Sequence, residues 1–297
     1  MQISRALVVY KKSYYELYGY QHQERRSTTR QERQHPIIQT MQHSHEENQR
    51  TLTDVCAAIE TLGLPYDCLY RGDLKSANGY DLLLSVGGDG TFLEVARHTV
   101  DTPVLGVNSD PSRSTAFFCA ADRTTIQRQL QALLAGALHQ VQLARLKVSI
   151  NDIPLPHVAL NDLLIAHVNP AAVTSYTLQI GEDSEAQKSS GLWVATAAGS
   201  TAAIRAAGGR IMPLRSRKLQ YLVREPYFGG GYRFRRLQGL LAPGSVLQVI
   251  SKMRRGRVFM DGPHLRYHLG LGDTLRISTE AAPVRVIGLD IKRRQRF

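Results

Sequence analysis

One short segment of the chain combines a carboxylate with a run of glycines. It is Gly87–Thr91, with the sequence Gly-Gly-Asp-Gly-Thr, called the glycine turn below. It follows an apolar stretch, 81–86, that predicts a buried strand, and it precedes a helical pattern over 92–98. Glycines allow positive φ angles and a close approach by phosphate, and the free N–H groups at a helix start favour an anion. Because an Asp repels phosphate unless it accepts a hydroxyl proton or holds Mg²⁺, the turn predicts phosphoryl chemistry.

Asp89 also has a simpler interpretation, as an ordinary turn residue and helix N-cap, since Asp-Gly is common in turns. We favour the chemical role because the full five-residue string directly after a buried strand is much rarer than an isolated Gly-Asp-Gly. The chain contains no Gly-x-x-x-x-Gly-Lys-Ser/Thr, which excludes a P-loop enzyme.

The elements that must position this turn alternate between strand and helix. Strands are expected over 6–10, 66–70, 81–86 and 104–108, and helices over 51–62, 92–98 and 124–138. This alternation predicts a doubly wound α/β domain over 1–140, with 284–297 returning to it. Over 141–283 the runs are short, β-rich and separated by turn residues, which predicts a β-rich second domain.

Composition excludes several classes of protein. Of 297 residues, 43% are hydrophobic and 21% are charged, as in a globular protein, and no stretch approaches the ~18 apolar residues of a membrane span. Three cysteines (Cys56, Cys68 and Cys119) lack metal spacing, so a reducing cytoplasm is the simplest expectation. The net charge of +12 suits a solvated surface, anionic small molecules or nucleic acid, and we expect no nucleic acid because no aromatic stripe accompanies the basic runs.

A polar tract over 24–49 is rich in Gln and His. It predicts either a long exposed helix or a mobile excursion. His35, His43 and His45 lie in this tract, and we expect a solvated helix face there rather than a metal site.

The glycine turn after a third strand resembles the first signature of the NAD kinases and of the wider superfamily with diacylglycerol kinases and 6-phosphofructokinases. Asn161-Asp162 looks like the family's Asn-Glu pair, and 190–202 is similar to its Asp-Gly-Leu…Thr-Pro-Thr-Gly-Ser-Thr-Ala stretch. Val258–Gly262 resembles its late Asp-Gly motif. Segments 10–16, 107–114, 188–192 and 224–226 resemble the mitochondrial-type branch and its bacterial relatives.

The resemblance implies a fold, an activity and a set of site residues. It implies an α/β domain that binds the phosphate donor, a β-rich domain that binds NAD, and Mg²⁺-dependent transfer from ATP or polyphosphate to the adenosine ribose 2′-hydroxyl of NAD. The general base would be Asp89. The donor phosphates would lie on Gly87, Gly88, Gly90, Thr91, Gly199, Ser200 and Thr201. NAD would contact Asn161, Asp162, Thr196 and Asp261, with Phe117 or Phe118 on the adenine. The partners would be NAD and a nucleoside triphosphate, in a homodimer or homotetramer.

The chain departs from the family pattern at several of these positions. Asn-Glu is shortened to Asn-Asp, the leading Asp of the third motif is Ser190, and Ala198 and Ala203 stand where the family has Thr and often Tyr. The departures at Ser190, Ala198 and Ala203 leave a weakly catalytic dinucleotide-binding regulator open. A lipid or sphingoid-base kinase of the same superfamily is a second rival because it shares the glycine turn, although Asn161-Asp162 and 199–201 argue against it.

Each segment also has a purely structural alternative. Asn161-Asp162 can be a turn between strands, 199–201 a helix N-cap without a ligand, and 261–263 a hairpin turn. Arg113 can grip a phosphate bidentately or pair with a carboxylate.

Overall fold

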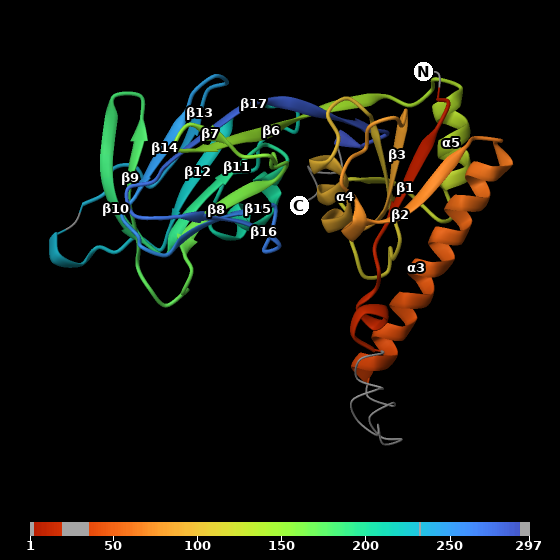
Figure 1. Ribbon diagram of the computed structural model, residues 1–297, viewed down its shortest axis with the longest axis horizontal. Coiled ribbons are helices and arrows are strands. Elements are labelled where there is room, and N and C mark those ends of the chain that lie inside the picture. Colours follow the sequence, from red (N-terminus) through yellow and green to blue (C-terminus); the bar gives the residue numbers. More distant parts are fainter. Residues whose placement is uncertain (1–2, 20–35, 232, 292–297) are drawn as a thin grey trace. The chain divides into compact units, whose positions relative to one another are not determined.

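The structure, a computed structural model, describes residues 3–19, 36–231 and 233–291 (Figure 1). The chain divides into two compact units. The first consists of Met1–Val141 and Arg285–Phe297, and the second of Gln142–Val284. Among the described residues, no helix combines the length and the apolar character needed to cross a membrane.

The first unit is built on a parallel sheet with the strand order β2-β1-β3-β4. Its strands are β1 (Ala6–Tyr10), β2 (Tyr66–Tyr70), β3 (Leu82–Gly87) and β4 (Val104–Asn108). β5 (Cys119–Asp122) also pairs with β4, and β17 (Thr274–Ile287) ends in this sheet through Val286, which pairs in parallel with Val104. All residues of β3 and β4 are buried, because helices cover both faces of a parallel sheet.

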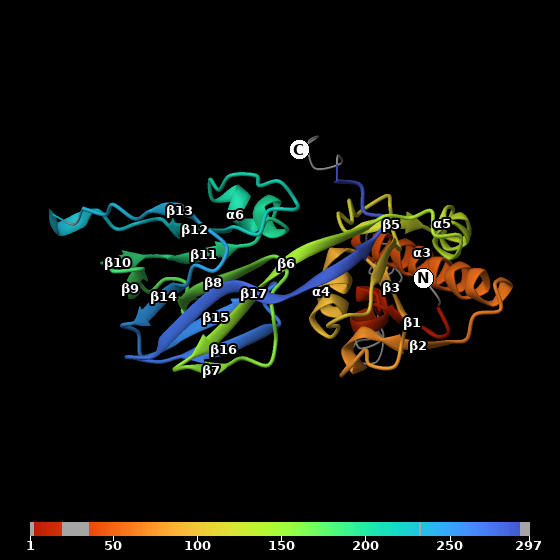
Figure 2. The ribbon, with the colours of Figure 1, turned by 90° about the horizontal axis from the view of Figure 1, so that it is seen from above.

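Helices α3 (Pro36–Thr61) and α5 (Ile126–Leu134) pack on one face of this sheet, and α4 (Asp89–Arg97) on the other (Figures 1 and 2). Residues of α3 and α5 share a core cluster with alternate residues of the strands, such as Val8 and Leu84. Helices on both faces confirm the predicted doubly wound α/β layer.

The sheet brings four strand ends to one edge. Because β1 pairs in parallel with both β2 and β3, and β3 with β4, the carboxyl ends of all four strands lie along the same edge. Lys11 follows β1, Arg71 follows β2, the glycine turn begins with the last residue of β3, and Ser109 follows β4. We call this edge, with its four loops, the carboxyl edge.

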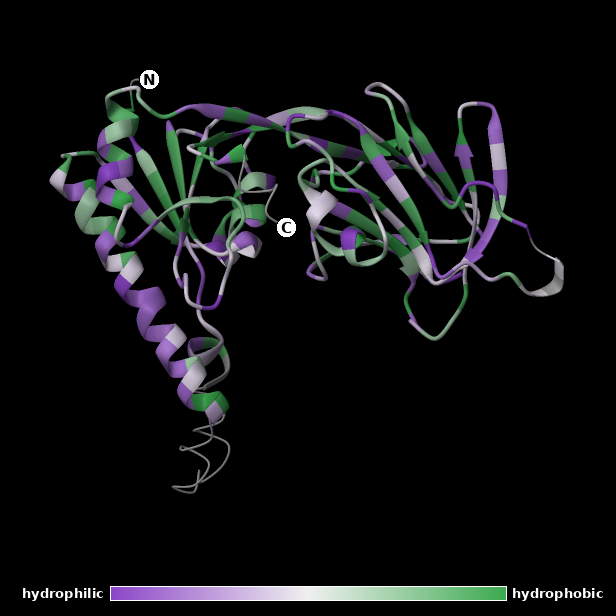
Figure 3. Cartoon of the chain, turned by 180° about the vertical axis from the view of Figure 1, so that it is seen from behind, coloured by the Kyte–Doolittle hydropathy of each residue, from purple (hydrophilic) through white to green (hydrophobic). Residues whose placement is uncertain are grey.

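Helix α3 begins earlier than the expected start at residue 51, and its polar half has a structural task (Figure 3). The helix over 36–49 agrees with the helical alternative for the polar tract, whereas 24–35, with His35, lies outside the described residues. The expectation of a solvated face is wrong for His45, whose Nδ1 lies 2.9 Å from the Ser13 hydroxyl. His43 is exposed, as expected.

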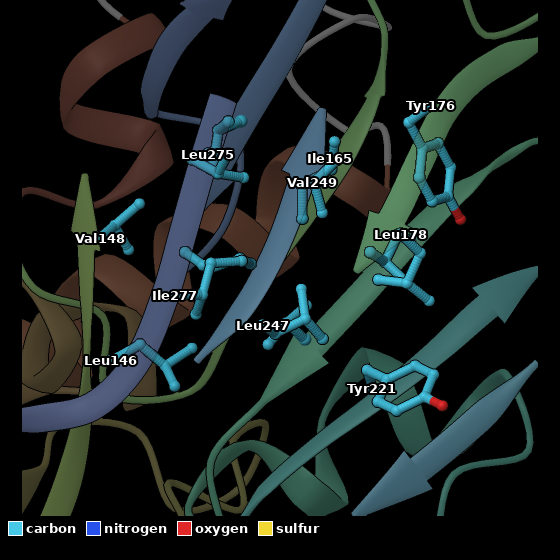
Figure 4. Close-up of a cluster of buried hydrophobic side chains, with 14 of the residues drawn as sticks. Leu146, Val148, Ile165, Tyr176, Leu178, Tyr221, Leu247, Val249, Leu275 and Ile277 are labelled. Carbon is cyan, nitrogen blue, oxygen red and sulfur yellow. The ribbon is translucent and has the colours of Figure 1, made fainter. Parts of the chain in front are cut away.

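The second unit is a β-rich sandwich with a large core between its two layers, which confirms the predicted β-rich class. One of its layers contains β6 (Gln140–Ile150), β7 (Ile153–Pro154), β9 (Thr174–Ile180), β10 (Asp183–Ser189), β14 (Leu247–Ser251) and the first part of β17. The other has the order β13-β12-β11-β8-β15-β16, made of β8 (Asp162–His167), β11 (Gly191–Ala195), β12 (Leu219–Arg224), β13 (Gln238–Leu241), β15 (Gly256–Met260) and β16 (Leu265–Leu269). Inward side chains of both layers, including Tyr176, Ile165 and Leu247, form the core shown in Figure 4.

Candidate functional site

In the first unit, the glycine turn joins β3 to α4 and places Asp89 in the first turn of that helix. Gly88, rather than Asp89, is the N-cap residue. The Oδ1 atom of Asp89 accepts a hydrogen bond of 3.0 Å from the backbone N–H of Phe118. No described residue makes a hydrogen bond to its Oδ2 atom. One oxygen therefore fixes the side chain, and the other remains available for chemistry.

The glycines of the turn are needed for space and not for positive φ angles. None of Gly87, Gly88 and Gly90 has a positive φ, so that part of the expectation is wrong. A Cβ on Gly87 would lie 2.2 Å from Oγ1 of Thr91, and one on Gly88 would lie 3.0 Å from Oγ of Ser114. The turn is thus packed tightly against the first turn of α4 on one side and against the loop after β4 on the other.

The loop after β4 is held by hydrogen bonds from its own residues and from α3. Asp110 is buried, and its carboxylate accepts from the hydroxyls of Ser44 and Ser112, each at 2.7 Å. Arg113 pairs with it at 3.3 Å, so Arg113 takes the carboxylate-pairing alternative. Burial alone would raise the pKa of Asp110, but these hydrogen bonds and Arg113 lower it below its usual range.

The two phenylalanines proposed for the adenine lie in different surroundings. Phe118 is buried, and its ring stacks on Phe92 with centroids 4.9 Å apart. Phe118 therefore takes part in the core of the first unit, and it is its backbone N–H that reaches Asp89. Phe117 is half-buried and meets the Phe118 ring edge-on at 5.5 Å.

In the second unit, Asp261 fastens the segment that contains Asn161 and Asp162. Asp261 lies in the turn between β15 and β16, as the hairpin alternative expects, with a φ of 49°. Its carboxylate accepts hydrogen bonds from three consecutive backbone N–H groups, those of Leu160 (2.8 Å), Asn161 (2.7 Å) and Asp162 (3.2 Å). Asp261 therefore fixes the backbone of Asn161 and of Asp162, the first residue of β8.

Thr196 and Gly199 lie against the other side of Asn161, and Ser200 is buried next to Gly199 in the chain. The Thr196 hydroxyl donates to the Leu160 carbonyl at 2.5 Å and accepts from the Gly199 N–H at 3.1 Å. Ser200 is fully buried, and its hydroxyl donates to the Ala197 carbonyl and accepts from the Met212 N–H. These two hydroxyls are thus committed to internal hydrogen bonds. The helix after 199–201 is only the short α6 (Ala203–Ala206), and Ala202 caps it without a side-chain bond.

The side chains of Asn161 and Asp162 are the polar groups of this cluster that remain uncommitted. Oδ1 of Asn161 is buried and finds no hydrogen-bond partner among the described residues, which is costly unless a ligand supplies a donor. Burial, and secondly the charge of Asp261, raise the pKa of Asp162 to about 7. A carboxylate with such a pKa next to an unpartnered amide is typical of a binding site for a polar ligand.

The raised pKa of Asp162 makes stability depend on pH. Because the folded value of about 7 exceeds the ordinary value of 3.8, this group's contribution is complete below pH 3.8 and is lost as the pH rises through about 7. Asp162→Asn removes the ionisation. The variant is therefore expected to gain melting temperature relative to the wild type at about pH 8, and to gain less at about pH 5. Thermal unfolding at both pH values checks this, and an equal change at both would contradict the assignment.

Sequence reasoning missed residues that the fold places at the carboxyl edge. Lys11 and Arg71 are half-buried there, and Arg71 Nη1 lies 3.4 Å from the Thr91 hydroxyl. The available signal was positional, because each is the first residue after a strand of a parallel sheet.

The comparisons with known proteins agree with this arrangement. Residues 6–138 match the ATP-NAD kinase N-terminal domain. A probable NADH kinase of Oryza sativa subsp. japonica is 37% identical over 255 residues, which is 78% of each chain. The chain belongs to the NAD kinase family. An NADH kinase of Arabidopsis thaliana is also 37% identical, over 73% of this chain and 75% of its own.

Two solved structures extend the likeness to the whole fold of this NAD kinase family member. A yeast NADH kinase complexed with NADH has a TM-score of 0.73 at 16% identity, covering 100% of this chain and 86% of its own. An NAD kinase from Archaeoglobus fulgidus in complex with ATP has a TM-score of 0.66 at 19% identity, covering 98% and 96%. Family membership makes the chain a phosphotransferase with an alcohol acceptor.

Proposed function

We propose that the chain transfers a phosphoryl group from ATP or polyphosphate to the 2′-hydroxyl of the adenosine ribose of NAD or NADH. The observation that supports this most is the state of Asp89. It lies at the start of α4 inside the glycine turn, with one carboxylate oxygen held by the Phe118 N–H. A fixed carboxylate with an uncommitted oxygen beside a phosphate-accepting turn is what a general base for a hydroxyl requires.

In this reaction Asp89 accepts the proton of the 2′-hydroxyl as the hydroxyl oxygen attacks the terminal phosphorus of the donor. The new O–P bond forms while the bond from that phosphorus to the bridging oxygen breaks, and the nucleoside diphosphate, or the polyphosphate shortened by one unit, leaves with the electron pair. Most of the rate enhancement comes from positioning the two oxygens in line and neutralising the phosphate charge. The free N–H groups of the glycine turn and the dipole of α4 contribute to that neutralisation.

Mg²⁺ would be held mainly by the donor. Among the described residues, no group of three or more His, Cys, Asp or Glu side chains is placed to hold a metal by itself. This fits Mg²⁺, which binds nucleotides through phosphate oxygens, water and one or two carboxylates. Asp89 is the carboxylate of the glycine turn that could complete such a set. When bound, the ion would offset the negative charge of the donor phosphates.

For the dinucleotide, we propose that Asn161 and Asp162 bind NAD directly and that Thr196 and Asp261 position them. The orphaned Oδ1 of Asn161 supports a direct contact, since a ribose hydroxyl or adenine amino group can donate to it. Asp162, ionised above about pH 7, can accept a second donor. Of the two phenylalanines, half-buried Phe117 remains the candidate for packing on adenine. Residues 199–201 would contact the phosphates of the phosphoryl donor through their backbone groups. The half-buried Thr201 hydroxyl could add a side-chain contact.

The test is to incubate the purified chain with MgATP or Mg-polyphosphate and each of four acceptors: NAD, NADH, diacylglycerol and sphingosine. Formation of NADP or NADPH, detected with an NADP-specific dehydrogenase, is the expected result. Phosphorylation of a lipid on a thin-layer plate, without any NADP, would establish the lipid kinase instead. A thermal shift with NAD, without product from any donor, would establish a dinucleotide-binding regulator. The same assay separates the two donors and the two redox forms of the acceptor.

The proposal includes an assembly and a compartment. The resemblance to NAD kinases supports a homodimer or homotetramer, which light scattering after size-exclusion chromatography measures. We propose a cytoplasmic location, consistent with cysteines that form no disulfide in the described residues.

A further inference from the structure

Two cations at the carboxyl edge form no salt bridge with any carboxylate of the described residues. Lys11 and Arg71 are both half-buried, and neither forms an ion pair with a described carboxylate. Asp110 attracts Lys11 and Glu94 attracts Arg71 electrostatically, but both carboxylates form their salt bridges with other cations. Glu94 pairs with Arg97 at 2.9 Å and with His98 at 3.3 Å, while Asp110 pairs with Arg113. Partly desolvated charges without partners are costly, which indicates that an anion belongs beside them.

Both cations lie close to the glycine turn. The Arg71 guanidinium contacts the Thr91 hydroxyl at 3.4 Å, and a Cβ built on Gly90 would meet Arg71 Nη1 at 3.6 Å and nothing nearer. Lys11 lies within electrostatic range of Arg71, Asp110 and Cys119, and the Cys119 thiol reaches the Gly87 carbonyl at 3.7 Å. Burial first, and then repulsion by Arg71, lower the pKa of Lys11 despite the attraction of Asp110. An anion between the two cations would relieve this repulsion.

The neighbouring charges have other roles, which separates Lys11 and Arg71 from a general basic surface. Lys12 places its ammonium 4.7 Å from the centre of the Tyr70 ring, and Arg5, at the other end of β1, pairs with Asp67 at 2.6 Å. The position of the two remaining cations follows from topology, since β1 and β2 are adjacent parallel strands that end at the same edge as the glycine turn.

We propose that Lys11 and Arg71 bind the phosphate chain of the phosphoryl donor, whether a nucleoside triphosphate or inorganic polyphosphate. The proposal rests on the proposed function for the identity of the reaction, but the binding it describes can be measured without turnover. Arg71 has the planar fork that recognises two phosphate oxygens at once, and Lys11 adds a compact charge from the next strand. Together they would hold the non-transferred phosphates while the glycine turn holds the reacting one.

The experiment is a calorimetric titration of the full chain with MgATP, with magnesium tripolyphosphate and with NAD. The test variants are Arg71→Gln, Lys11→Gln and Arg71→Lys. The control variants are Arg5→Gln and Lys75→Gln, each of which removes one exposed positive charge from the same unit. Melting temperatures establish that each variant is folded.

We expect Arg71→Gln and Lys11→Gln to weaken MgATP and tripolyphosphate binding in parallel by about tenfold or more, since each removes a hydrogen bond to a charged group. The affinity of Arg71→Lys for both phosphate ligands should lie between those of Arg71→Gln and the wild type, because lysine keeps the positive charge but lacks the planar guanidinium. NAD affinity should stay within about twofold of wild type in every variant, and the two controls should bind all three ligands normally. In turnover, KM for the donor should rise while KM for NAD does not.

Three results would overturn the proposal: wild-type affinity for both phosphate ligands in folded Arg71→Gln and Lys11→Gln, an equal loss in the controls, or a loss of NAD binding instead. A loss of MgATP binding alone would also contradict it, because the cations would then recognise the nucleoside.

If the variants lose phosphate binding but the wild type makes no NADP, the proposed function fails and this inference stands. If NADP forms and the variants bind normally, the inference fails and the function stands. Turnover with ATP against polyphosphate identifies which donor the site serves.

Discussion

Asp89→Asn is expected to lower kcat for NAD phosphorylation by about three orders of magnitude, within the range attributed to a positioned general base. The amide retains an Oδ1 acceptor for the Phe118 N–H, so the turn and α4 keep their geometry. What is lost is the ability to accept the proton of the attacking hydroxyl. Steady-state kinetics with saturating MgATP and NAD measure the loss, and calorimetry should show that NAD affinity is little changed.

Asp101→Asn is the matched control for this variant. Asp101 is an exposed carboxylate of the same unit that pairs with Arg285 at 3.3 Å, and its loss should leave kcat unchanged. If Asp89→Asn is folded and retains wild-type turnover, the general-base role is wrong. If it loses activity because MgATP no longer binds, Asp89 acts on the metal or the phosphates instead of on the hydroxyl.

Gly199→Ala is expected to damage the dinucleotide cluster through a direct backbone collision. A Cβ on Gly199 would lie 2.0 Å from the carbonyl oxygen and 2.4 Å from the carbonyl carbon of Asn161. Both atoms belong to the backbone that Asp261 and Thr196 hold in place, so the segment cannot move aside cheaply. We expect a loss of about 2–3 kcal/mol in the free energy of unfolding, the upper part of the range for overpacking. NAD affinity should fall as well, because Asn161 is displaced.

Gly270→Ala provides the comparison for Gly199→Ala in the same unit. Its Cβ would approach only the side-chain ends of His268 (3.1 Å) and Asp273 (3.2 Å), which can shift. Denaturant unfolding of the two variants, with NAD binding measured on each, separates a specific collision from a general intolerance of alanine. Equal stability and equal NAD affinity in the two variants would show that the contact between Gly199 and Asn161 does not matter.

The parallel layer could be predicted from the sequence because its signals are local. The strands over 6–10, 66–70 and 104–108 are short runs of strand-forming residues next to turn residues, and the structure has them at those bounds. The position of the glycine turn between a buried strand and a helix was predictable for the same reason. The reason for its glycines was predicted wrongly. Gly87 has no room for a Cβ because the Thr91 side chain in the first turn of α4 lies against it, and a hydrophobic pattern carries no information about that contact.

The internal bonds of the site could not be predicted, because they join distant parts of the chain. Asp261 binds the N–H groups of residues about 100 positions away, and nothing near Asp261 in the sequence indicates this. The Ser200 hydroxyl is committed to the Met212 N–H by a loop whose path is not periodic. Lys11 and Arg71 were missed because each is an ordinary cation until parallel pairing places both at the carboxyl edge.

The same limit applies to several strands of the second unit. β11 (Gly191–Ala195) reads Gly-Leu-Trp-Val-Ala, and four of its five residues are buried. A central strand covered on both faces shows no alternation, so the sequence indicated a motif there but not a strand. β12 and β13 flank an Arg- and Gly-rich segment that obscures their pairing.

The central claim is that the Asp89 carboxylate reaches the acceptor hydroxyl. A crystal structure with NAD and a non-hydrolysable MgATP analogue tests it directly. The account predicts that Oδ2 of Asp89 lies about 2.6–3.2 Å from the 2′-oxygen of the adenosine ribose. It also predicts that this 2′-oxygen, the terminal phosphorus and the bridging oxygen of the donor lie in one line. An Asp89 carboxylate directed away from every ribose oxygen, with both ligands in place, would contradict it.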